Sequence, residues 1–180
     1  LLLKRLFSLR VIGITGSFGK TTTKELLLSI LSQDGNSVAS IGNIDPIYNI
    51  PTTILRCRPW TKYLILEMGI EYPGEMDFYL WLAPVDIAAI TGIGLTHTEF
   101  LKDTNTIRQE KFKITRDARH VVDYSKKPPE LKNNLKIATE VARILKIDSR
   151  DIKNGLATFT PAPHRMHRIN HPSGAIIVDD

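Results

Sequence analysis

A glycine-punctuated segment near the start of the chain has the residue types of a phosphate-binding loop. It reads Thr-Gly-Ser-Phe-Gly-Lys-Thr-Thr over residues 15–22, between an apolar run at residues 11–14 and a leucine-rich run that begins at Lys24. Glycines let backbone N–H groups turn toward phosphate oxygens, and a helix that starts there adds free N–H donors. In this pattern Lys20 reaches the β- and γ-phosphates, and the Thr21 hydroxyl ligates Mg²⁺. We therefore expect a nucleoside triphosphate site here.

The loop departs from the full phosphate-loop motif at one position. The motif has a glycine six residues before the lysine, where this chain has Ile14, and Gly13 lies one residue too early. The alternative interpretation is a glycine turn that only joins a strand to a helix. The Gly-Lys-Thr-Thr run, placed between a strand pattern and a helix pattern, favours phosphate binding. The residues expected to bind are Gly16, Ser17, Phe18, Gly19, Lys20, Thr21 and Thr22.

Two further polar residues follow strand patterns. Glu67 lies at the end of the apolar run at residues 63–68, and His97 lies in the turn after the run at residues 86–91. In open parallel sheets, ligands bind beyond the carboxyl ends of the strands. Glu67 could therefore hold a metal ion near the phosphates, although a solvated carboxylate at a strand end is the simpler alternative. His97 could ligate a metal at the same edge, but a lone histidine is weak evidence by itself.

Basic residues elsewhere indicate no site by composition alone. Lys111 lies in Arg-Gln-Glu-Lys-Phe-Lys-Ile, which is typical of a solvated, charged helix face. His164, Arg165, His167 and Arg168 likewise fit a basic surface. The net charge of +5 is modest and comes without a long basic block, so it does not favour nucleic-acid binding.

Strand and helix patterns alternate along the chain. Strands are expected at residues 11–14, 38–40, 63–68, 86–91, 120–123, 165–170 and 175–178, and helices at residues 22–32, 51–55, 76–82, 104–119, 131–146 and 149–155. Gly35 is expected to end the first helix in a left-handed conformation, and Pro51 is expected to open the second. The alternation predicts an α/β domain with a doubly wound, mostly parallel sheet that carries the phosphate loop.

The 180 residues are enough for one domain with a sizeable core. The single cysteine, Cys57, excludes an internal disulfide and suits a reducing compartment. The apolar start is too short to cross a membrane, and no charged segment precedes its leucines as in a signal peptide. We therefore expect a cytoplasmic protein. Residues 1–10 would connect to an upstream domain, residues 11–163 would form the phosphate-loop domain, and residues 164–180 would lead into a further domain.

Several segments together resemble the ATP-binding central domain of the Mur ligase superfamily, whose members form amide bonds. The phosphate-loop segment, residues 13–27, is most similar to the members that add D-alanyl-D-alanine during peptidoglycan precursor synthesis. Residues 42–53 resemble the second loop of those ligases, and residues 66–75 resemble the family segment that has a glutamate at a strand end. Residues 154–166 resemble the run into the third domain, and residues 178–180 resemble its opening.

The resemblance implies two magnesium sites. Thr21 and Glu67 would bind one Mg²⁺, and His97 would belong to the site of a second. Lys111 matches a lysine that is carbamylated in many members of the family. A carbamate turns the lysine cation into an anion, which explains how a lysine can serve a metal site.

The resemblance also implies how ATP would be held. Lys20 and residues 16–19 would hold the phosphates, and Arg165 matches an arginine near the γ-phosphate. The other residues matched to nucleotide contacts are Thr22, Asn134, Asp179 and Asp180, the last two near the ribose. The catalytic residues would be Lys20, His97, Lys111 and Arg165.

The chain departs from the family pattern in three places. The segment that begins at His97 is more similar to folylpolyglutamate synthases, which are relatives of these ligases. The family usually has His-Asn where this chain has Glu130 and Leu131, so an adenine-contacting asparagine is missing. The stretch at residues 114–131 is also shorter than in the family.

The resemblance implies an ATP-dependent ligase that activates a carboxylate as an acyl phosphate. The expected partners are a nucleotide-linked peptide, which would carry the carboxylate, and an amine, with D-alanyl-D-alanine the first candidate. A glutamate ligase similar to folylpolyglutamate synthase is one alternative. A phosphate-loop kinase, a switch NTPase or a non-catalytic nucleotide-binding module is another. We expect a monomer that binds neither nucleic acid nor membrane, and no ligation by these 180 residues alone.

Overall fold

A single parallel sheet lies at the centre of the molecule. The structure is a computed structural model, and it describes residues 8–42, 44–94, 104–160, 167–170 and 176–179. The sheet contains β1 (Arg10–Thr15), β2 (Ser37–Ala39), β3 (Tyr63–Glu67), β4 (Ile87–Ile90) and β5 (His120–Asp123). The strands lie in the order β2-β3-β1-β4-β5, and every neighbouring pair is parallel. The predicted parallel α/β sheet is confirmed.

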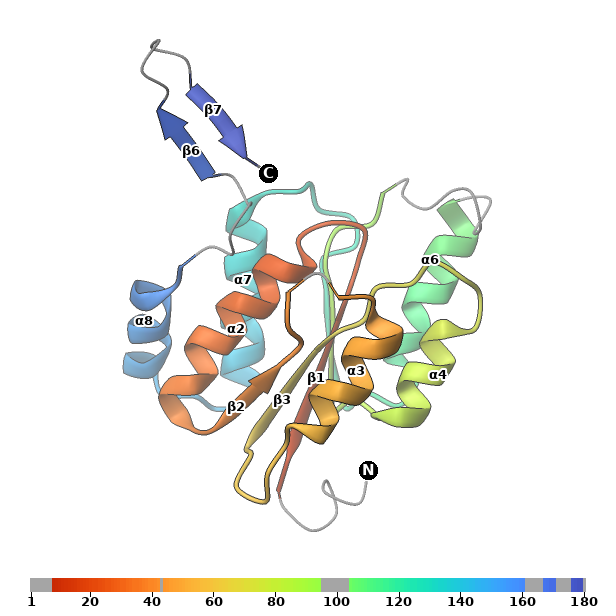
Figure 1. Cartoon of the computed structure of the whole chain (residues 1–180), viewed down its shortest axis with the longest axis horizontal. Helices are drawn as coiled ribbons and strands as arrows, with labels where there is room; N and C mark the ends of the chain where they lie inside the picture. Colours follow the sequence, from red (N-terminus) through yellow and green to blue (C-terminus); the bar gives the residue numbers. More distant parts are fainter. Residues whose placement is uncertain (1–7, 43, 95–103, 161–166, 171–175, 180) are drawn as a thin grey trace.

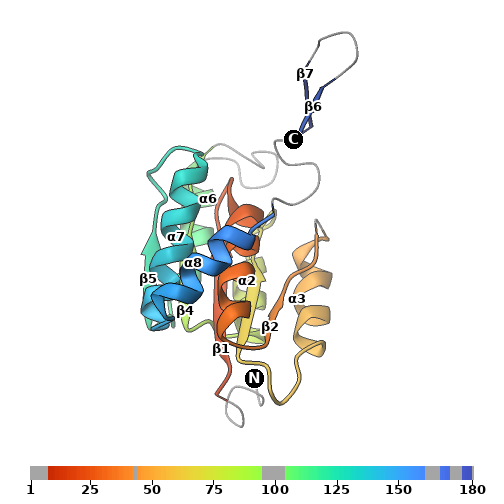
Figure 2. The ribbon, with the colours of Figure 1, turned by 90° about the vertical axis from the view of Figure 1, so that its left-hand side faces the viewer.

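Helices cover both faces of this sheet, which Figure 1 shows nearly edge-on. One face carries α2 (Lys20–Asp34), α7 (Leu131–Ile144) and α8 (Ser149–Thr158). The other face carries α3 (Pro46–Leu55), α4 (Glu75–Leu82), α6 (Thr104–Phe112) and the short 3₁₀ helix η1 (Lys113–Thr115). In the turned view, α3 lies near the β2 edge and α7 near the β5 edge (Figure 2). The arrangement is doubly wound, as the sequence predicted.

Alternation along the strands produces two apolar cores. In β1, Val11 packs with the α3–α4 side, whereas Ile12 and Ile14 pack with the α2–α7 side. All three side chains are fully buried. The strands are apolar on both faces because helices exclude water from both sides of the sheet.

The first helix is longer than predicted and ends differently. It begins at Lys20 and runs to Asp34. Gly35 has φ 175°, which is extended backbone, so the predicted left-handed ending is wrong. The Gly35 N–H donates to the Leu31 carbonyl at 3.1 Å, and a Cβ atom at Gly35 would lie 2.8 Å from Lys62 Cδ. A larger residue here would have to displace the flexible Lys62 side chain.

The start of the second helix was also predicted incorrectly. α3 begins at Pro46, and Pro51 lies inside it. The Asp45 side chain caps the helix by accepting a hydrogen bond from the Ile47 N–H at 3.0 Å. An aspartate at the N-cap followed by proline at the first helical position is a strong start signal, and it precedes the weaker signal at Pro51.

The remaining differences concern the ends of elements. The helix predicted at residues 104–119 ends at Phe112 and continues only as η1. The last helix is capped by Asp148, whose side chain accepts from the Arg150 N–H at 2.7 Å, and it extends beyond Gly155. β6 (His167–Asn170) and β7 (Ile176–Asp179) pair antiparallel as a sheet of their own. Within the described ranges, no helix is long and apolar enough to span a membrane.

Candidate nucleotide-binding site

The loop between β1 and α2 depends on two glycines with positive φ. Gly16 has φ 151° and Gly19 has φ 79°. A Cβ atom at Gly16 would overlap the Thr91 hydroxyl, and one at Gly19 would lie 2.5 Å from Asn134 Oδ1. A larger residue at either position would strain the backbone or displace its neighbour. Gly13 belongs to β1 instead, where a Cβ atom would lie 2.7 Å from Val85 Cγ1.

Hydrogen bonds fix the loop to the carboxyl end of β4. The Ser17 N–H donates to the Gly92 carbonyl at 2.9 Å. The Ser17 hydroxyl donates to the Gly94 carbonyl at 2.9 Å and accepts from the Gly94 N–H at 3.0 Å. The Thr91 hydroxyl donates to the Phe18 carbonyl at 2.5 Å. The Phe18 ring packs so closely on Gly92 that a Cβ atom there would overlap it. These contacts fix the shape of the loop.

The N-terminus of α2 opens directly from this loop. Its first residue is Lys20, and the N-cap residue, Gly19, has no side chain to bond the first N–H groups. Uncapped N–H groups at a helix N-terminus form an anion site, strengthened by the helix dipole. The Lys20 ammonium donates to the Gly16 carbonyl at 3.1 Å and so lies over the loop. Positive charge is therefore concentrated where phosphates would sit.

Glu67 and Thr21 meet beside the loop. The Thr21 hydroxyl donates to Glu67 Oε1 at 3.1 Å. The Glu67 N–H donates to the Ser40 hydroxyl at 3.1 Å, and the Thr15 hydroxyl donates to the Met68 carbonyl at 2.8 Å. The end of β3 is thus held by its neighbours in the sheet. The carboxylate that the sequence singled out lies next to the threonine predicted to share its metal.

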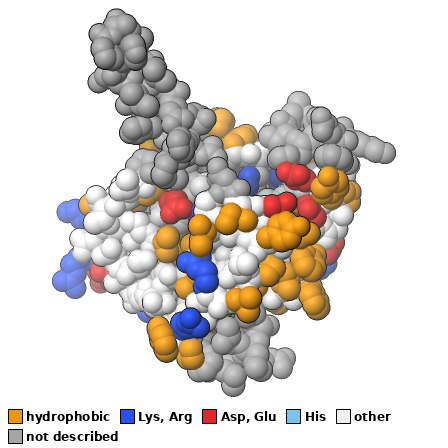
Figure 3. Space-filling view, viewed as in Figure 1, with side chains coloured by type: hydrophobic (Ala, Val, Ile, Leu, Met, Phe, Trp, Pro, Cys, Tyr) orange, Lys and Arg blue, Asp and Glu red, His pale blue; other side chains and the backbone are white. Residues whose placement is uncertain are grey.

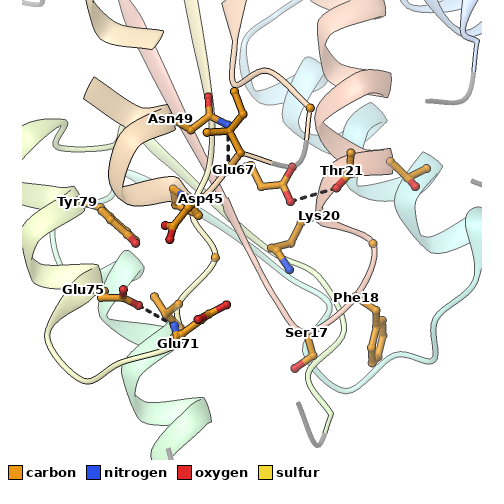
Figure 4. Close-up of a pocket in the computed structure, with 17 residues that line it drawn as sticks. Ser17, Phe18, Lys20, Thr21, Asp45, Asn49, Glu67, Glu71, Glu75 and Tyr79 are labelled. Carbon is orange, nitrogen blue, oxygen red and sulfur yellow. Dashed lines mark hydrogen bonds between the residues drawn. The ribbon is translucent and has the colours of Figure 1, made fainter. Parts of the chain in front are cut away.

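A cavity of about 510 Å³ lies between these groups and the helices of the opposite face (Figure 4). Its first wall belongs to the loop, α2 and the end of β3, and is formed by Ser17, Phe18, Gly19, Lys20, Thr21, Thr22 and Glu67. Its second wall belongs to α3, α4 and the segments that precede them, and includes Asp45, Asn49, Glu71, Glu75 and Tyr79. One cavity therefore collects six of the seven predicted loop residues and Glu67.

The two walls differ in charge. Figure 4 shows Lys20 facing Asp45, Glu71 and Glu75 across the cavity. Burial raises the pKa of Tyr79, and the negative charges of Glu75, Asp45 and Glu71 raise it further. The Glu75 carboxylate accepts from the N–H groups of Glu71 and Tyr72 at 2.6 and 2.9 Å, which fixes the turn before α4. Anionic phosphates are favoured only at the first wall.

Asn49 builds part of the second wall. It is buried in α3, where its amide nitrogen donates to the Ile41 and Ile44 carbonyls at 3.0 and 3.3 Å. Its amide oxygen accepts from the Ile41 N–H at 3.1 Å and the Thr53 hydroxyl at 3.2 Å. One side chain therefore attaches the backbone before α3 to the helix itself.

Lys111 is buried, with a relative exposure of 1%. The interpretation of its segment as a solvated helix face is therefore wrong at this position, because α6 turns this residue inward. Burial, together with the positive charge of nearby Lys20, lowers the pKa of Lys111 to about 8. Its neighbour Glu110, also buried, accepts from the Gly74 N–H at 2.8 Å and pairs with Lys113 at 2.6 Å.

Several predicted site residues cannot be compared with this cavity. His97, Arg165 and Asp180 lie outside the described residues, and Asp179 is described only as part of the β7 backbone. Asn134 lies in the first turn of α7 against Gly19 of the loop. Within the described part of the chain, no three His, Cys, Asp or Glu side chains form a group that could hold a metal ion.

Sequence reasoning missed Asn49, Tyr79 and Lys24. Asn49 and Tyr79 lie on the second wall, where only tertiary structure brings α3 and α4 to the cavity. Lys24 is fully buried behind Glu67. The sequence offered no clear signal for this burial, because the same helix also buries the polar residues Thr21 and Thr23.

Comparison with known proteins identifies the family. The model of the Mur ligase middle domain matches residues 14–146. The chain belongs to the Mur ligase family. Two curated relatives, from Borreliella burgdorferi and Bacillus subtilis, are named UDP-N-acetylmuramoyl-tripeptide–D-alanyl-D-alanine ligase. They are 40% and 38% identical over 107 and 105 residues, which is 59% and 58% of this chain but only 23% of each relative.

Solved structures of Mur ligases share the fold. MurF from Acinetobacter baumannii matches with a TM-score of 0.87 at 23% identity, over 99% of this chain and 52% of the other. MurF from Thermotoga maritima, solved in complex with ADP, matches with a TM-score of 0.80 at 23% identity, over 98% and 55%. FolC from E. coli is a more distant match, with a TM-score of 0.68 at 16% identity, over 99% and 63%. This Mur ligase chain thus spans about half the length of the MurF structures that it matches.

Proposed function

We propose that this chain is the ATP-binding middle domain of a UDP-N-acetylmuramoyl-tripeptide–D-alanyl-D-alanine ligase of peptidoglycan synthesis. The observation that carries the proposal is the Thr21–Glu67 hydrogen bond on the wall of a cavity formed by the phosphate loop. A phosphate loop alone would suit any NTPase. Its combination with the strand-end glutamate, in a chain similar to ligases of that name, supports the ligase.

The oxygen atoms beside the loop fit a Mg²⁺ ion. Thr21 offers a hydroxyl and Glu67 a carboxylate, 3.1 Å apart at the cavity. Hard oxygen ligands, few from the protein and the rest from water and phosphate, are what Mg²⁺ prefers. In the proposal Thr21 and Glu67 hold the ion, which when bound offsets negative charge on the ATP phosphates.

The residues of this chain bind and orient ATP in the proposed reaction. The loop N–H groups and the α2 N-terminus hold the phosphates, and Lys20 turns from the Gly16 carbonyl to the γ-phosphate. The peptide carboxylate attacks the γ-phosphorus, which gives an acyl phosphate and ADP. The amine of D-alanyl-D-alanine then attacks the acyl carbon, and phosphate leaves as the amide bond forms and the amine loses a proton. Lys20 stabilises the charge that develops during phosphoryl transfer.

Lys111 is proposed to carry a carbamate. Its neutral amine would attack CO₂, an N–C bond would form, and a proton would leave. The burial that lowers the pKa of Lys111 to about 8 supports this step, because it raises the neutral fraction near pH 7. His97 is assigned to a second metal, and Arg165 to the γ-phosphate. Contacts to the nucleoside are assigned to Asn134, Asp179 and Asp180.

The rest of the enzyme is proposed to lie outside residues 11–163. Residues 1–10 would connect to the domain that binds the UDP-linked peptide, and residues 164–180 would lead into the domain that closes over ATP. The partners are then the UDP-linked tripeptide and D-alanyl-D-alanine, with no nucleic acid or membrane. We propose a monomer in the cytoplasm, where ATP is available.

The test is acceptor-dependent phosphate release by the full-length protein. With Mg²⁺, ATP and UDP-N-acetylmuramoyl-tripeptide, we expect release only when D-alanyl-D-alanine is added, in step with amide product. Glu67→Gln should lower the rate by at least about tenfold, because loss of even an outer partner of a metal ligand typically costs about 10- to 100-fold. Release that depends on glutamate and a folate would replace this proposal with a folylpolyglutamate synthase-like ligase. Hydrolysis that needs no acceptor would replace it with a switch NTPase.

A further inference from the structure

Lys24 is a fully buried lysine that the proposed reaction does not use. Its side chain has no exposed surface, and its ammonium lies 3.0 Å from Glu25 Oε1 and 3.8 Å from Glu67 Oε2. The contact with Glu25 is an ion pair without hydrogen-bond geometry. Burial of an ammonium is costly unless a counter-charge compensates it.

Lys24 and Thr21 approach the same carboxylate from one face of α2. They are three residues apart, so their side chains lie on neighbouring positions of the helix surface. The Thr21 hydroxyl bonds Glu67 Oε1, whereas the Lys24 ammonium faces Glu67 Oε2. Among the described residues, Oε2 is a buried oxygen that makes no hydrogen bond. The two oxygens of Glu67 therefore have different partners.

The position of Lys24 relative to the cavity separates it from Lys20. Lys20, Thr21 and Glu67 line the cavity, and Lys24 does not. Lys24 contacts the carboxylate without lining the cavity, so it can fix the rotation of the Glu67 side chain from behind. Groups behind metal ligands commonly orient those ligands, and their loss typically costs about 10- to 100-fold in metal affinity.

We propose that Lys24 is a positioning residue for the metal carboxylate. It holds Oε2 of Glu67 from behind, so that Oε1 stays turned toward Thr21 and the divalent cation. This inference rests on the proposed magnesium role of Glu67, but it does not depend on which acceptor the enzyme uses.

The test is the magnesium dependence of ATP binding by the full-length protein. A fluorescent ATP analogue is titrated in EDTA and at increasing Mg²⁺, for wild type and Lys24→Met. We expect the Mg²⁺ midpoint, the Mg²⁺ concentration at half of the binding change, to be about tenfold or more higher in Lys24→Met than in wild type. Binding in EDTA should change by less than about threefold. If Lys24 served only the fold, Lys24→Met would lower the thermal stability without changing the Mg²⁺ midpoint of ATP binding.

Two controls define the partner of Lys24. Lys62→Met removes another lysine ion pair between the same two elements, because Lys62 pairs with Asp34 of α2 just before β3 begins. It should leave the Mg²⁺ midpoint unchanged. Glu25→Gln should also leave it within about twofold. A Glu25→Gln protein that behaves like Lys24→Met would overturn the inference, since Glu25 would then be the partner that matters.

A thermal readout covers the case in which Lys24→Met does not fold. Glu67→Gln leaves the ammonium buried without its second carboxylate, so it should melt at a lower temperature than the double variant Lys24→Met/Glu67→Gln. A double variant no more stable than Glu67→Gln would overturn the pairing.

The two proposals can fail separately. If the wild-type protein does not ligate but its ATP binding still depends on Mg²⁺, only the proposed function is rejected. An unmoved midpoint in Lys24→Met with ligation intact would reject only the role of Lys24.

Discussion

At the scale of single residues, Lys111 shows how burial changes the chemistry of a side chain. Sequence composition does not distinguish Lys111 from the exposed lysines around it. The fold, however, buries it near the positive charge of Lys20. Both effects disfavour the ammonium form. A lysine in this state is a poor ion-pair partner and a better nucleophile toward CO₂, so the same burial that destabilises the fold supports the proposed carbamate.

Lys111→Met should therefore separate stability from activity. Methionine keeps most of the volume and removes the charge, so in CO₂-free buffer at pH 7 we expect the variant to be more stable by on the order of 1–3 kcal/mol. The folded-state pKa of about 8 lies below the ordinary 10.5, so the penalty is complete below pH 8. It should shrink between about pH 8 and 10.5, where the folded lysine has lost its proton and the unfolded one has not. Urea unfolding of both proteins across this range measures the difference.

Activity should move in the opposite direction. In the full-length enzyme, Lys111→Met should lower ligation by about 10- to 100-fold, as loss of a metal-site group does. Added bicarbonate should raise the wild-type rate and leave the variant unchanged. Lys113→Met is a suitable control, because Lys113 is partly exposed and pairs with Asp77 and Glu110. Near-wild-type ligation by Lys111→Met, with and without CO₂, would remove Lys111 from the site.

At the scale of elements, the sequence predicted the features that depend on local residue patterns. The phosphate loop follows from its glycines and from the strand and helix patterns on either side. The order of strands and helices follows from apolar runs. The start of α3 was misjudged because two prolines compete, and only Asp45 before Pro46 distinguishes them. The burial of Lys24 and Lys111 could not be predicted, because it depends on how α2 and α6 pack on the sheet.

The second wall of the cavity depends on one such tertiary feature. Asn49→Ala should detach Ile41 and Ile44 from α3, since it removes every hydrogen bond that the Asn49 amide makes to them. Ile41 and Ile44 are half exposed, so their freed groups can bond to water. A hydrogen bond of this kind contributes about 0.5–1.5 kcal/mol net, so we expect a loss of roughly 1–3 kcal/mol in stability. Amide exchange at Ile41 should become faster. Thr52→Ala removes hydroxyl contacts to the Tyr48 and Asn49 carbonyls on the same helix and should change neither measurement by much. Unchanged exchange at Ile41 in Asn49→Ala would show that other contacts hold this wall.

At the scale of the molecule, the cavity has walls from one domain only. Apolar side chains gather on the surface over α3 and α4 (Figure 3), and the exposed ones there include Tyr48, Leu55, Phe78 and Trp81. Ile44, which lines the cavity, is also half exposed. The described residues provide a phosphate loop beside the proposed metal carboxylate, whereas the groups that bind the acceptor peptide are proposed to lie in other domains. Phosphate binding and ligation should therefore be separable.

The 180-residue chain alone should bind Mg-ATP weakly and should not ligate. Lys20, Thr21 and Glu67 line one cavity within this chain, so triphosphate affinity should persist and should fall when Mg²⁺ is removed. Ligation needs an amine held near the acyl phosphate, and such proximity contributes up to about 7–11 kcal/mol to lowering a barrier. Calorimetry with ATP and an amide-product assay, each on the chain and on the full-length protein, measure the two properties. Lys20→Met in the chain should abolish ATP binding, which confirms that the signal comes from the loop. Turnover by the isolated chain at the full-length rate would show that residues 1–180 contain the acceptor site as well.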